Sequence, residues 1–469
     1  MSAILHFTSD GWQSRLDEDF TEENVARIAE AAGRVWSRAL PGAIVYVGYD
    51  ARPEAERFAC LAGRVLAGYG LAVMVSDRYV PTPALSWAVG EDNRACGALM
   101  VTGSYHPYDY LGIKLYMSDG GIGTTEFLDE VESEIDASAS GVHGAIERRD
   151  IATPYFDMLC GVVNGDAIAR SHLRVVYDSL YGAGRGYMPA VLGALGVDTV
   201  EIHGEPDDEM PDVHPEPVEP WVDDCEQAVT EVGASAGLVN DGDGVRVGAV
   251  DGNGAFVTPH QVAALVLEHM FEHRGETGRV VLGVSASVLV RRVAQEHGCR
   301  ITVRPVGFKH IYKEMTKGDV LLGAEEAGGI AVGGHMLERD GLYAALLLCE
   351  LMATSGKGLA ELVAELGKRY GATSYARRDL RVEPGAIDVF RTMLPGLNPQ
   401  SVAGREPVAV SHMDGLRLEF DDESWVLMRP SRTKPVVRVY AEAPTIQERD
   451  RLLEAACDIA RGETGVMDS

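Results

Sequence analysis

The sequence predicts an α/β protein with three related mixed-sheet α/β domains and a smaller α+β C-terminal domain, arranged around one central cleft. Three observations support this prediction. The chain has 469 residues, which is too long for one hydrophobic core. Short β-rich apolar runs alternate with longer amphipathic stretches through most of the sequence, as in βαβ units. From about residue 370 this pattern changes to alternating strands followed by a helix.

The first unit contains three predicted strands, and the third of them ends next to a serine. Residues 43–48 and 71–75 are predicted to be buried strands, with a helix containing Ala59 to Leu66 between them. A strand over 98–101 places Ser104 at its carboxyl end. Open α/β sheets position ligand-binding groups at this edge, because strand ends and helix N-termini converge there.

The same pattern occurs twice more along the chain. Residues 173–178 begin a second unit, a helix follows near Tyr187, and a strand over 236–240 leads directly into an aspartate loop. A third unit begins with a strand over 280–284, and its strand over 320–322 leads into a loop with two glutamates. Three units that each end in a loop of chemically functional residues indicate three related domains around one cleft.

The last unit is smaller and has a different pattern. Its expected elements are strands over 416–420, 425–428 and 436–440 and a helix over 447–460. Segments rich in Gly, Ser, Asp and Pro near 137–145 and 206–220 are expected to be a linker and a loop within the second domain. We therefore divide the chain into domain I (1–143), domain II (144–252), domain III (253–370) and domain IV (371–469).

Composition and charge narrow the class of function. With 46% hydrophobic and 24% charged residues, the chain is typical of a globular protein and not of a disordered one. Its net charge of −29 opposes binding to nucleic acid or to an anionic membrane surface. An acidic protein that binds a small phosphorylated molecule must gather its basic residues locally. The candidates for these locally gathered basic residues are Arg429 and Arg438, and separately Lys309.

The cysteines and the N-terminus point to an intracellular location. The seven cysteines include no CxxC pair and are odd in number, which argues against a disulfide framework or a zinc site. The N-terminus lacks a basic region followed by an apolar stretch, and no apolar run reaches membrane-spanning length. We expect a cytoplasmic protein whose cysteines are structural. They are Cys60, Cys96, Cys160, Cys225, Cys299, Cys349 and Cys457.

The serine loop, residues 101–107 followed by Gly112 and Lys114, is the most informative segment. A serine in a tight turn can carry a phosphoryl group. The loop resembles the active-serine loop of the α-D-phosphohexomutases, the phosphoglucomutase/phosphomannomutase family, whose usual form is Thr-Ala-Ser-His-Asn-Pro. Gly103, Tyr105 and His106 stand where Ala, His and Asn are usual in that family.

Three further segments resemble the other functional loops of this family, in the family's order along the chain. Together they identify the sequence as a divergent member over its whole length. The segments are the magnesium loop (residues 240–246), the sugar loop (323–328) and the phosphate loop (429–435) with Arg438.

The resemblance implies the following roles at the reaction centre. Ser104 would carry the phosphoryl group, Lys114 would transfer a proton with the sugar hydroxyl, and Arg246 would lie near the phosphoserine. His106 would substitute for the displaced family histidine. Mg²⁺ would be held by Ser104, Asp241 and Asp243, since two carboxylates separated by glycines can converge on a hard cation. Val245 replaces the family's third aspartate, which would weaken the metal site.

The resemblance also implies a set of substrate contacts. Glu325 and Glu326 would accept hydrogen bonds from sugar hydroxyls, and Ala327 lacks the hydroxyl of the usual serine. A second phosphate would be bound by two guanidinium groups and two hydroxyls around a proline-stiffened turn. The implied substrate-binding residues are Arg52, Lys309, Glu325, Glu326, His335, Arg429, Ser431, Thr433 and Arg438.

Each segment taken alone also has an ordinary structural explanation. Ser104 and Lys114 could be a turn serine and a surface lysine, the aspartate loop a solvated turn, and the glutamate pair a solvated helix start. Lys309 could likewise be a solvated lysine, and His335 could be a structural histidine whose hydrogen bonds are all made within the protein. The order of the four loops along the chain favours the functional interpretation.

The expected function is that of a phosphosugar mutase. Such an enzyme would interconvert hexose 1-phosphate and 6-phosphate, of the glucose or mannose type, through a phosphoserine and a bisphosphate intermediate. The alternatives are another reaction on a phosphorylated sugar, cyclitol or nucleoside, and a non-catalytic phosphosugar-binding homologue. The altered positions Gln13, Tyr105, His106, Val245 and Ala327 keep both alternatives open. The partner is a phosphorylated sugar, and the protein is expected to be a monomer or a homodimer.

Overall fold

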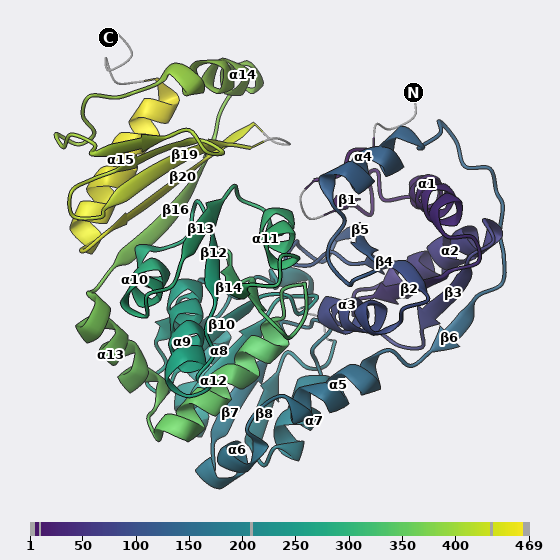
Figure 1. Cartoon of the computed structure of the whole chain (residues 1–469), viewed down its shortest axis with the longest axis horizontal. Helices are drawn as coiled ribbons and strands as arrows, with labels where there is room; N and C mark the ends of the chain where they lie inside the picture. Colours follow the sequence, from purple (N-terminus) through teal and green to yellow (C-terminus); the bar gives the residue numbers. More distant parts are fainter. Residues whose placement is uncertain (1–4, 9–10, 207–209, 432–434, 463–469) are drawn as a thin grey trace.

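The chain forms four units, each built on its own β-sheet (Figure 1). The computed structural model describes residues 5–8, 11–206, 210–431 and 435–462. The first three sheets are mixed and are accompanied by helices, whereas the fourth is antiparallel throughout. The predicted fold class is therefore confirmed.

The sheet of domain I has the strand order β1-β5-β4-β2-β3-β6. Strands β4, β2, β3 and β6 are parallel neighbours, while β5 is antiparallel to both β4 and β1. Every residue of β2 is buried, as expected for a parallel strand covered by helices on both faces. The elements are β1 (Trp12–Arg15), α1 (Glu22–Ala39), β2 (Ile44–Tyr49), α2 (Ala55–Gly68), β3 (Ala72–Ser76), α3 (Thr82–Glu91), β4 (Ala95–Val101), β5 (Tyr110–Met117), α4 (Thr125–Ser133) and β6 (Glu147–Arg149).

Domain II has the strand order β11-β10-β9-β7-β8. Strands β9, β7 and β8 are parallel, and β10 is antiparallel to β9. The elements are α5 (Ala152–Gly161), α6 (Gly165–Ser171), β7 (Arg174–Asp178), α7 (Tyr187–Ala194), β8 (Asp198–Ile202), η1 (Met210–Asp212), α8 (Asp223–Val232), β9 (Ala236–Asn240), β10 (Val247–Asp251) and β11 (Phe256–Val257).

Domain III repeats this arrangement with the strand order β13-β12-β14-β15. Strands β13, β12 and β14 are parallel, and β15 is antiparallel to β14. The elements are α9 (Pro259–Glu272), β12 (Arg279–Gly283), α10 (Val288–Glu296), β13 (Ile301–Arg304), α11 (Phe308–Met315), β14 (Val320–Ala324), β15 (Ile330–Val332), α12 (Gly341–Ser355) and α13 (Leu359–Tyr370).

Domain IV has the strand order β16-β20-β19-β18-β17. Its hydrophobic cluster is formed by the sheet together with α14 and α15. The elements are β16 (Ser374–Arg381), α14 (Pro384–Met393), η2 (Leu394–Gly396), β17 (Ala409–Ser411), β18 (Leu416–Glu419), β19 (Trp425–Pro430), β20 (Val436–Ala443) and α15 (Ile446–Arg461).

Two sheets extend beyond the domain limits that we expected from the sequence. Strand β6 pairs with β3 of domain I although it follows residue 143, and β11 pairs with β10 of domain II although it follows residue 252. Residues 137–145 contain no helix or strand, as expected for a linker. We propose domain limits that follow β6 and β11.

Each α/β domain places its functional loop at the same point of its sheet. The loop connects the last parallel strand to the antiparallel strand beside it: β4 to β5, β9 to β10, and β14 to β15. In domain IV the corresponding loop joins β19 to its antiparallel neighbour β20. The four functional segments are therefore all connections between antiparallel neighbours.

Hydrophobic packing joins the three α/β domains more closely than it joins domain IV. One continuous cluster includes Val80 of domain I, Leu238 of domain II and Leu322 of domain III. Domain IV has a separate cluster and contacts domain III through a small apolar group that contains Val288 and Trp425. In Figure 1 domain IV accordingly lies to one side, next to β12, β13 and α10.

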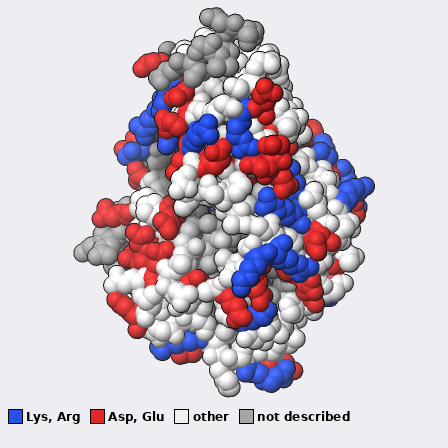
Figure 2. Space-filling model, turned by 90° about the vertical axis from the view of Figure 1, so that its left-hand side faces the viewer, with Lys and Arg blue, Asp and Glu red and all other residues white. Residues whose placement is uncertain are grey.

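Charged residues of both signs lie on the surface among uncharged ones. On the face shown in Figure 2, acidic and basic side chains are interspersed. Many charged side chains of the protein form ion pairs, for example Arg405 with Asp421 and Asp422 at 2.8 and 2.7 Å. The net negative charge is therefore not collected into one continuous patch on this face.

A buried carboxylate connects domains III and IV. Glu442 on β20 accepts hydrogen bonds from Trp425 Nε1 at 2.8 Å and from the backbone N–H of Val288 at 2.9 Å. It also accepts one from the hydroxyl of Ser287, the residue that caps α10. A carboxylate at a helix N-terminus is stabilised by the free N–H groups and by the helix dipole.

We predict that Glu442→Ala loosens the junction between domains III and IV. The substitution leaves three buried donors without their acceptor, so the free energy of unfolding should fall by about 3 kcal/mol. The fall can be measured by urea unfolding of the full chain. Glu406→Ala, at an exposed position of the same domain, should change it by less than about 0.5 kcal/mol; equal effects of the two substitutions would contradict the prediction.

Candidate active site

Ser104 is held in a buried and strained turn after β4. Its φ angle is +49°, in the left-handed region that side chains other than glycine rarely adopt. The residue is 1% exposed. Such a conformation persists only where the surroundings hold it in place, and it is found often at functional sites.

The guanidinium of Arg52 fixes the backbone of this turn. It donates hydrogen bonds to Ser104 O at 2.6 Å and to Tyr110 O at 3.0 Å, and it also binds the carbonyls of His106 and Pro107. Arg52 is 5% exposed. In this geometry its donors are directed into the serine loop, and its contact with substrate stays a prediction.

Asp50 completes the support of the turn. Its carboxylate accepts hydrogen bonds from Thr102 Oγ1 at 2.6 Å and from the N–H of Gly103 at 3.1 Å, and lies 3.3 Å from Arg52 Nε. A Cβ atom on Gly103 would lie 2.3 Å from Arg52 Cζ, closer than atoms can approach. The close packing of Arg52 therefore explains why glycine replaces the family's usual alanine at position 103.

Two carboxylates from the aspartate loop reach the hydroxyl of Ser104. Ser104 Oγ lies 2.8 Å from Asp243 Oδ1 and 3.2 Å from Asp241 Oδ2. A Cβ atom on Gly242 would lie 2.4 Å from Ser104 O, so only glycine allows the two loops to approach this closely. Both aspartates are completely buried.

A lysine and a threonine contact the carboxylate of Asp243. Lys114 Nζ lies 2.7 Å from Asp243 Oδ2, which also accepts a hydrogen bond from Thr82 Oγ1 at 2.6 Å. Burial opposes ionisation of Asp243, but the charge and the hydrogen bond of Lys114 outweigh it and hold the pKa of Asp243 below its usual range. Asp243 is therefore ionised at neutral pH.

Arg246 makes the corresponding contact with Asp241. Its guanidinium lies 2.9 Å from Asp241 Oδ2 and 3.2 Å from Ser104 Oγ. Burial and the nearby negative charge of Asp243 raise the pKa of Asp241 above its usual range. The same guanidinium lies 4.3 Å from the ring centre of Tyr105, a cation–π distance. Tyr105 thus occupies the position of the usual histidine and covers Arg246.

The altered residues His106 and Val245 lie beside this centre. The His106 ring lies 4.5 Å from the Tyr105 ring and 5.2 Å from the Tyr110 ring. Its proposed function as a substitute for the family histidine stays a hypothesis. Val245 is completely buried and offers no oxygen to a cation.

The sugar loop lies directly against the aspartate loop. Arg246 and Gly329 form an antiparallel bridge, and the N–H of Val247 donates to Gly328 O at 3.1 Å. Glu325 Oε2 accepts a hydrogen bond from Arg339 Nη1 at 2.8 Å. Glu325 is thus held by a buried arginine within domain III.

Glu326 faces domain IV. Its Oε2 accepts a hydrogen bond from Ser285 Oγ at 2.8 Å, and its Oε1 lies 3.5 Å from the hydroxyl of Tyr440 on β20. The two neighbouring glutamates therefore point to different partners. Glu326 thus connects the sugar loop to the sheet that carries the phosphate loop.

The structure separates the two other residues expected to contact substrate in domain III. Lys309 lies in the first turn of α11 and is partly exposed. His335 Nε2 lies 2.7 Å from Asp340 Oδ2, and its ring stacks on Tyr343 at 4.0 Å. The His335 side chain is 4% exposed. His335 is thus bound within domain III, and its contact with substrate stays a prediction.

The two arginines of the phosphate loop stand opposite each other. Arg429 on β19 pairs in register with Arg438 on β20. Arg429 Nε donates to Asp414 Oδ2 at 2.6 Å, and Arg438 Nε lies 3.7 Å from Asp379 Oδ2. Both guanidinium groups therefore already have an acidic neighbour.

The phosphate loop also contains two residues with hydroxyl groups, Ser431 and Thr433. Ser431 is 7% exposed, and its N–H donates to Val436 O at 2.8 Å. Thr433 lies outside the described residues.

Sequence reasoning missed several residues that position this site. Asp50, Thr82, Arg339 and Asp340 were not among the predicted site residues. Their common signal is a polar side chain directly after a strand or at a helix start, where buried donors and acceptors collect. That signal is too frequent in sequences to identify a residue by itself.

Comparison with known proteins decides the family. Models of the phosphoglucomutase/phosphomannomutase family match the chain for α/β/α domain I over residues 5–141, domain II over 153–254, domain III over 258–370 and the C-terminal domain over 360–459. The chain belongs to the phosphoglucomutase/phosphomannomutase family. It is an intramolecular phosphotransferase of this family, and thus an isomerase.

Individual relatives cover nearly the whole chain. A phosphoglucomutase/phosphomannomutase of Thermococcus kodakarensis is 28% identical over 96% of each chain. A probable phosphoglucosamine mutase of Methanopyrus kandleri is 29% identical over 97% of this chain and 98% of that protein. The crystal structure of a putative phosphomannomutase from Thermus thermophilus is 32% identical, covers 98% of this chain and 100% of that one, and superimposes with a TM-score of 0.88.

Among the described residues, no helix is both long and apolar enough to cross a membrane.

We predict that Arg52→Lys destabilises the serine loop while keeping the charge. Lysine cannot reach the carbonyls that the planar guanidinium binds together, so the free energy of unfolding should fall by about 2 kcal/mol. Urea unfolding measures the loss. Arg57→Lys, an exposed substitution on the next helix, is the control and should be nearly neutral; a stable Arg52→Lys variant with only a raised KM would support the substrate-binding interpretation.

Proposed function

We propose that this protein interconverts hexose 1-phosphate and hexose 6-phosphate, of the glucose or mannose type, through a phosphoserine at Ser104 and a bisphosphate intermediate. The observation that carries the proposal is the position of Ser104 Oγ, which is buried among Asp241, Asp243 and Arg246 with Lys114 next to Asp243. These groups supply the positioning, charge neutralisation and proton transfer that phosphoryl transfer requires.

The first transfer moves the phosphoryl group from Ser104 to the sugar. The bond between Ser104 Oγ and phosphorus breaks while the free sugar hydroxyl forms a new P–O bond. The hydroxyl proton passes to Lys114 Nζ, which enters this step as the neutral amine, and the ammonium group that forms pairs with Asp243. Ser104 Oγ is released as an alkoxide beside Arg246. Arg246, within hydrogen-bond distance of Ser104 Oγ, neutralises negative charge on the transferring group.

The second transfer regenerates the enzyme. The bisphosphate turns over in the cleft, and its other phosphoryl group moves to Ser104 Oγ. The sugar oxygen that loses this phosphoryl group takes the proton back from Lys114. No net cofactor change occurs, so the sum of the two transfers is an isomerisation.

Mg²⁺ is the proposed cofactor. The chemistry of the donor set fits it, because Ser104 Oγ and the two aspartates bring three hard oxygen atoms together at 2.8 and 3.2 Å. When bound, Mg²⁺ would stabilise negative charge on the phosphoryl oxygens. An N-acetylphosphoglucosamine mutase of Aspergillus fumigatus, which shares the fold at 13% identity, was solved with magnesium.

The other loops would hold the rest of the substrate. We assign the non-reacting phosphate to Arg429, Arg438, Ser431 and Thr433, and the sugar hydroxyls to Glu325 and Glu326. Since Arg429 already pairs with Asp414, a bound phosphate must compete with that carboxylate. Domain IV is joined to domain III by a small apolar cluster, so movement of domain IV could close the cleft and protect the phosphoserine from water.

Glucosamine phosphates form a second substrate class to test. Several relatives of similar identity are named phosphoglucosamine mutase, including that of Salinispora arenicola at 29% identity. The sugar loop also lacks the serine hydroxyl, because Ala327 replaces it. Assays should therefore include glucosamine 6-phosphate beside glucose 1-phosphate and mannose 1-phosphate.

We predict that Ser104→Ala removes both the covalent phosphoryl group and the activity. The substitution deletes the atom that carries the phosphoryl group, so kcat should fall by at least about 10³-fold. Intact-mass analysis and a coupled mutase assay with a hexose bisphosphate activator measure the two effects. Thr102→Ser, which keeps a hydroxyl two residues earlier, should retain the phosphoryl group. Full activity of Ser104→Ala would exclude the phosphoserine mechanism.

We predict that Val245→Asp strengthens magnesium binding. A third carboxylate would join the two aspartates of the loop, so the Mg²⁺ concentration for half-maximal activity should fall about tenfold. The matched control is Val245→Asn, because the asparagine side chain has nearly the same shape as aspartate but no charge. Equal Mg²⁺ dependence of the two variants would show that position 245 does not face the cation, and EDTA-resistant activity of the unaltered protein would contradict the metal proposal itself.

A further inference from the structure

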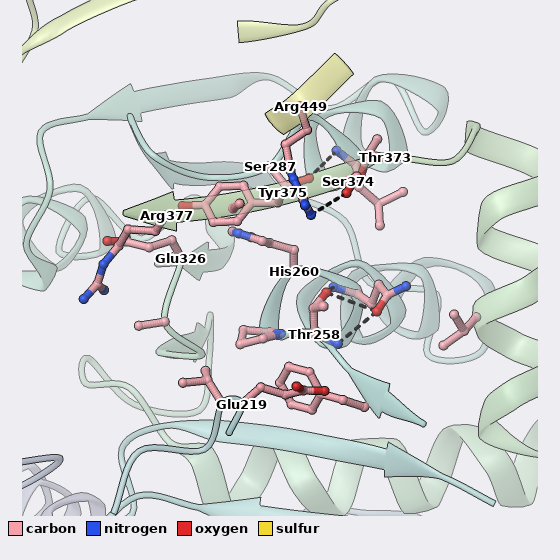
Figure 3. Close-up of a pocket in the computed structure, with 18 of the residues that line it drawn as sticks. Glu219, Thr258, His260, Ser287, Glu326, Thr373, Ser374, Tyr375, Arg377 and Arg449 are labelled. Atoms are coloured by element: carbon pink, nitrogen blue, oxygen red, sulfur yellow. Dashed lines mark hydrogen bonds between the residues drawn. The ribbon is translucent and has the colours of Figure 1, made fainter. Parts of the chain in front are cut away.

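A second cavity lies between domains II, III and IV. Its volume is about 760 Å³, within the usual range for small-molecule sites. Figure 3 shows it with the side chains that surround it. Among the described residues, its lining includes Glu326 and Ala327 of the sugar loop but none of Ser104, Asp241 or Arg429.

Two buried polar groups in this cavity have no hydrogen-bond partner among the described residues. They are His260 Nε2 on α9 and the hydroxyl of Tyr375 on β16. His260 is 5% exposed, and the two rings lie 4.3 Å apart. Figure 3 shows both rings directed toward Glu326. Since buried polar groups are nearly always paired, these atoms are suited to bind a ligand that enters the cavity.

Both of these groups are uncharged near neutral pH. Burial lowers the pKa of His260 below its usual value, and burial together with the charge of Glu326 raises the pKa of Tyr375 well above its own. This end of the cavity therefore offers a neutral imidazole, a neutral phenol and the Glu326 carboxylate. The two neutral rings can each donate or accept a hydrogen bond, whereas the carboxylate only accepts.

The charges around the cavity disfavour a phosphate. Arg377 Nε donates to Asp379 at 2.9 Å, and Arg449 donates to Asp450 at 2.8 Å and to Ser374 at 2.8 Å. Both lining arginines are therefore already paired. The lining also includes the carboxylates of Glu216, Glu219 and Glu326, which repel an anion.

The remaining lining suits a ring with hydroxyl groups. Carboxylates accept hydrogen bonds from hydroxyls, and the hydroxyl of Thr373 adds a group that can both donate and accept. Trp221, which is 37% exposed, and Phe256 provide aromatic surface. An apolar ring face can pack on such a surface.

We propose that this cavity is a second binding site, for an uncharged monosaccharide or cyclitol. The hydroxyls of the ligand exchange hydrogen bonds with His260 Nε2 and the Tyr375 hydroxyl. The site is separate from the phosphate-dependent cleft and shares the sugar loop with it. It does not require the mutase activity, since none of the groups that bind the ligand carries or transfers a phosphoryl group.

The test measures binding of uncharged sugars to the full chain carrying Ser104→Ala, with the cleft saturated by glucose 1,6-bisphosphate. The probes are glucose, mannose, N-acetylglucosamine and myo-inositol, with uridine as a nucleoside of similar polarity, and the readout is ligand-observed NMR followed by calorimetry. Tyr375→Phe removes one hydroxyl from the cavity. Ala372→Trp, at an exposed lining position, blocks the cavity without altering the core. Tyr69→Phe in domain I is the matched control.

We expect at least one sugar or the cyclitol to bind at millimolar concentration. Tyr375→Phe should weaken this binding about 3- to 10-fold, Ala372→Trp should abolish it, and Tyr69→Phe should leave it unchanged. The proposal is overturned if none of the four probes binds, if only uridine binds, or if binding survives Ala372→Trp. Binding that glucose 1,6-bisphosphate displaces would place the sugar in the cleft and would also overturn it. Failure of the mutase assays would leave these outcomes unaffected, so the two proposals can fail separately.

Discussion

The close approach of the serine loop to the aspartate loop is the contact on which the rest of the site depends. Backbone hydrogen bonds fasten the aspartate loop to all three α/β domains: Thr82 N to Asp243 O at 2.9 Å, Ala183 N to Gly242 O at 2.9 Å, and Gly341 N to Gly244 O at 3.0 Å. Hydrogen bonds of this kind fix position without needing a particular side chain. The reaction centre is therefore located by the backbone, and the side chains supply its charge.

Charge pairing then allows two buried carboxylates to lie beside one hydroxyl. Two like charges in a buried site raise the free energy unless cations compensate them. Lys114 and Arg246 provide this compensation, each against a different aspartate. The same pairing recurs at the phosphate loop, where Asp414 holds Arg429. A protein of net charge −29 can thus present cations to a phosphosugar, because its basic groups are gathered where acidic neighbours orient them.

The altered residues of the loops have structural explanations of unequal strength. Gly103 follows from the position of Arg52, and Tyr105 packs over Arg246. Val245 is buried without replacing the lost carboxylate, and no structural feature explains it. Ala327 lines the second cavity together with Glu326, so the sugar loop faces two spaces. In domain III, Glu325 and Glu326 follow each other in sequence but have separate partners.

The sequence by itself determined the family fold, the order of the domains and the buried central strands, and it singled out candidate residues for the reaction centre. Runs of apolar residues predict buried strands. Ser104, Lys114, Asp241 and Asp243 lie in recognisable motifs that follow such runs. About half of the strands were not predicted, most of them at or near the sheet edges. Among them, β6 consists of three charged residues and β11 of two residues, so both are too short to show periodicity. Only the tertiary structure decided that Arg52 supports a turn, that His335 is bound to Asp340, and that His260 and Tyr375 meet beside Glu326. The sequence gives the type of each side chain. The residue that this side chain contacts often lies far away along the chain, and only the packing of the tertiary structure determines which residue that is.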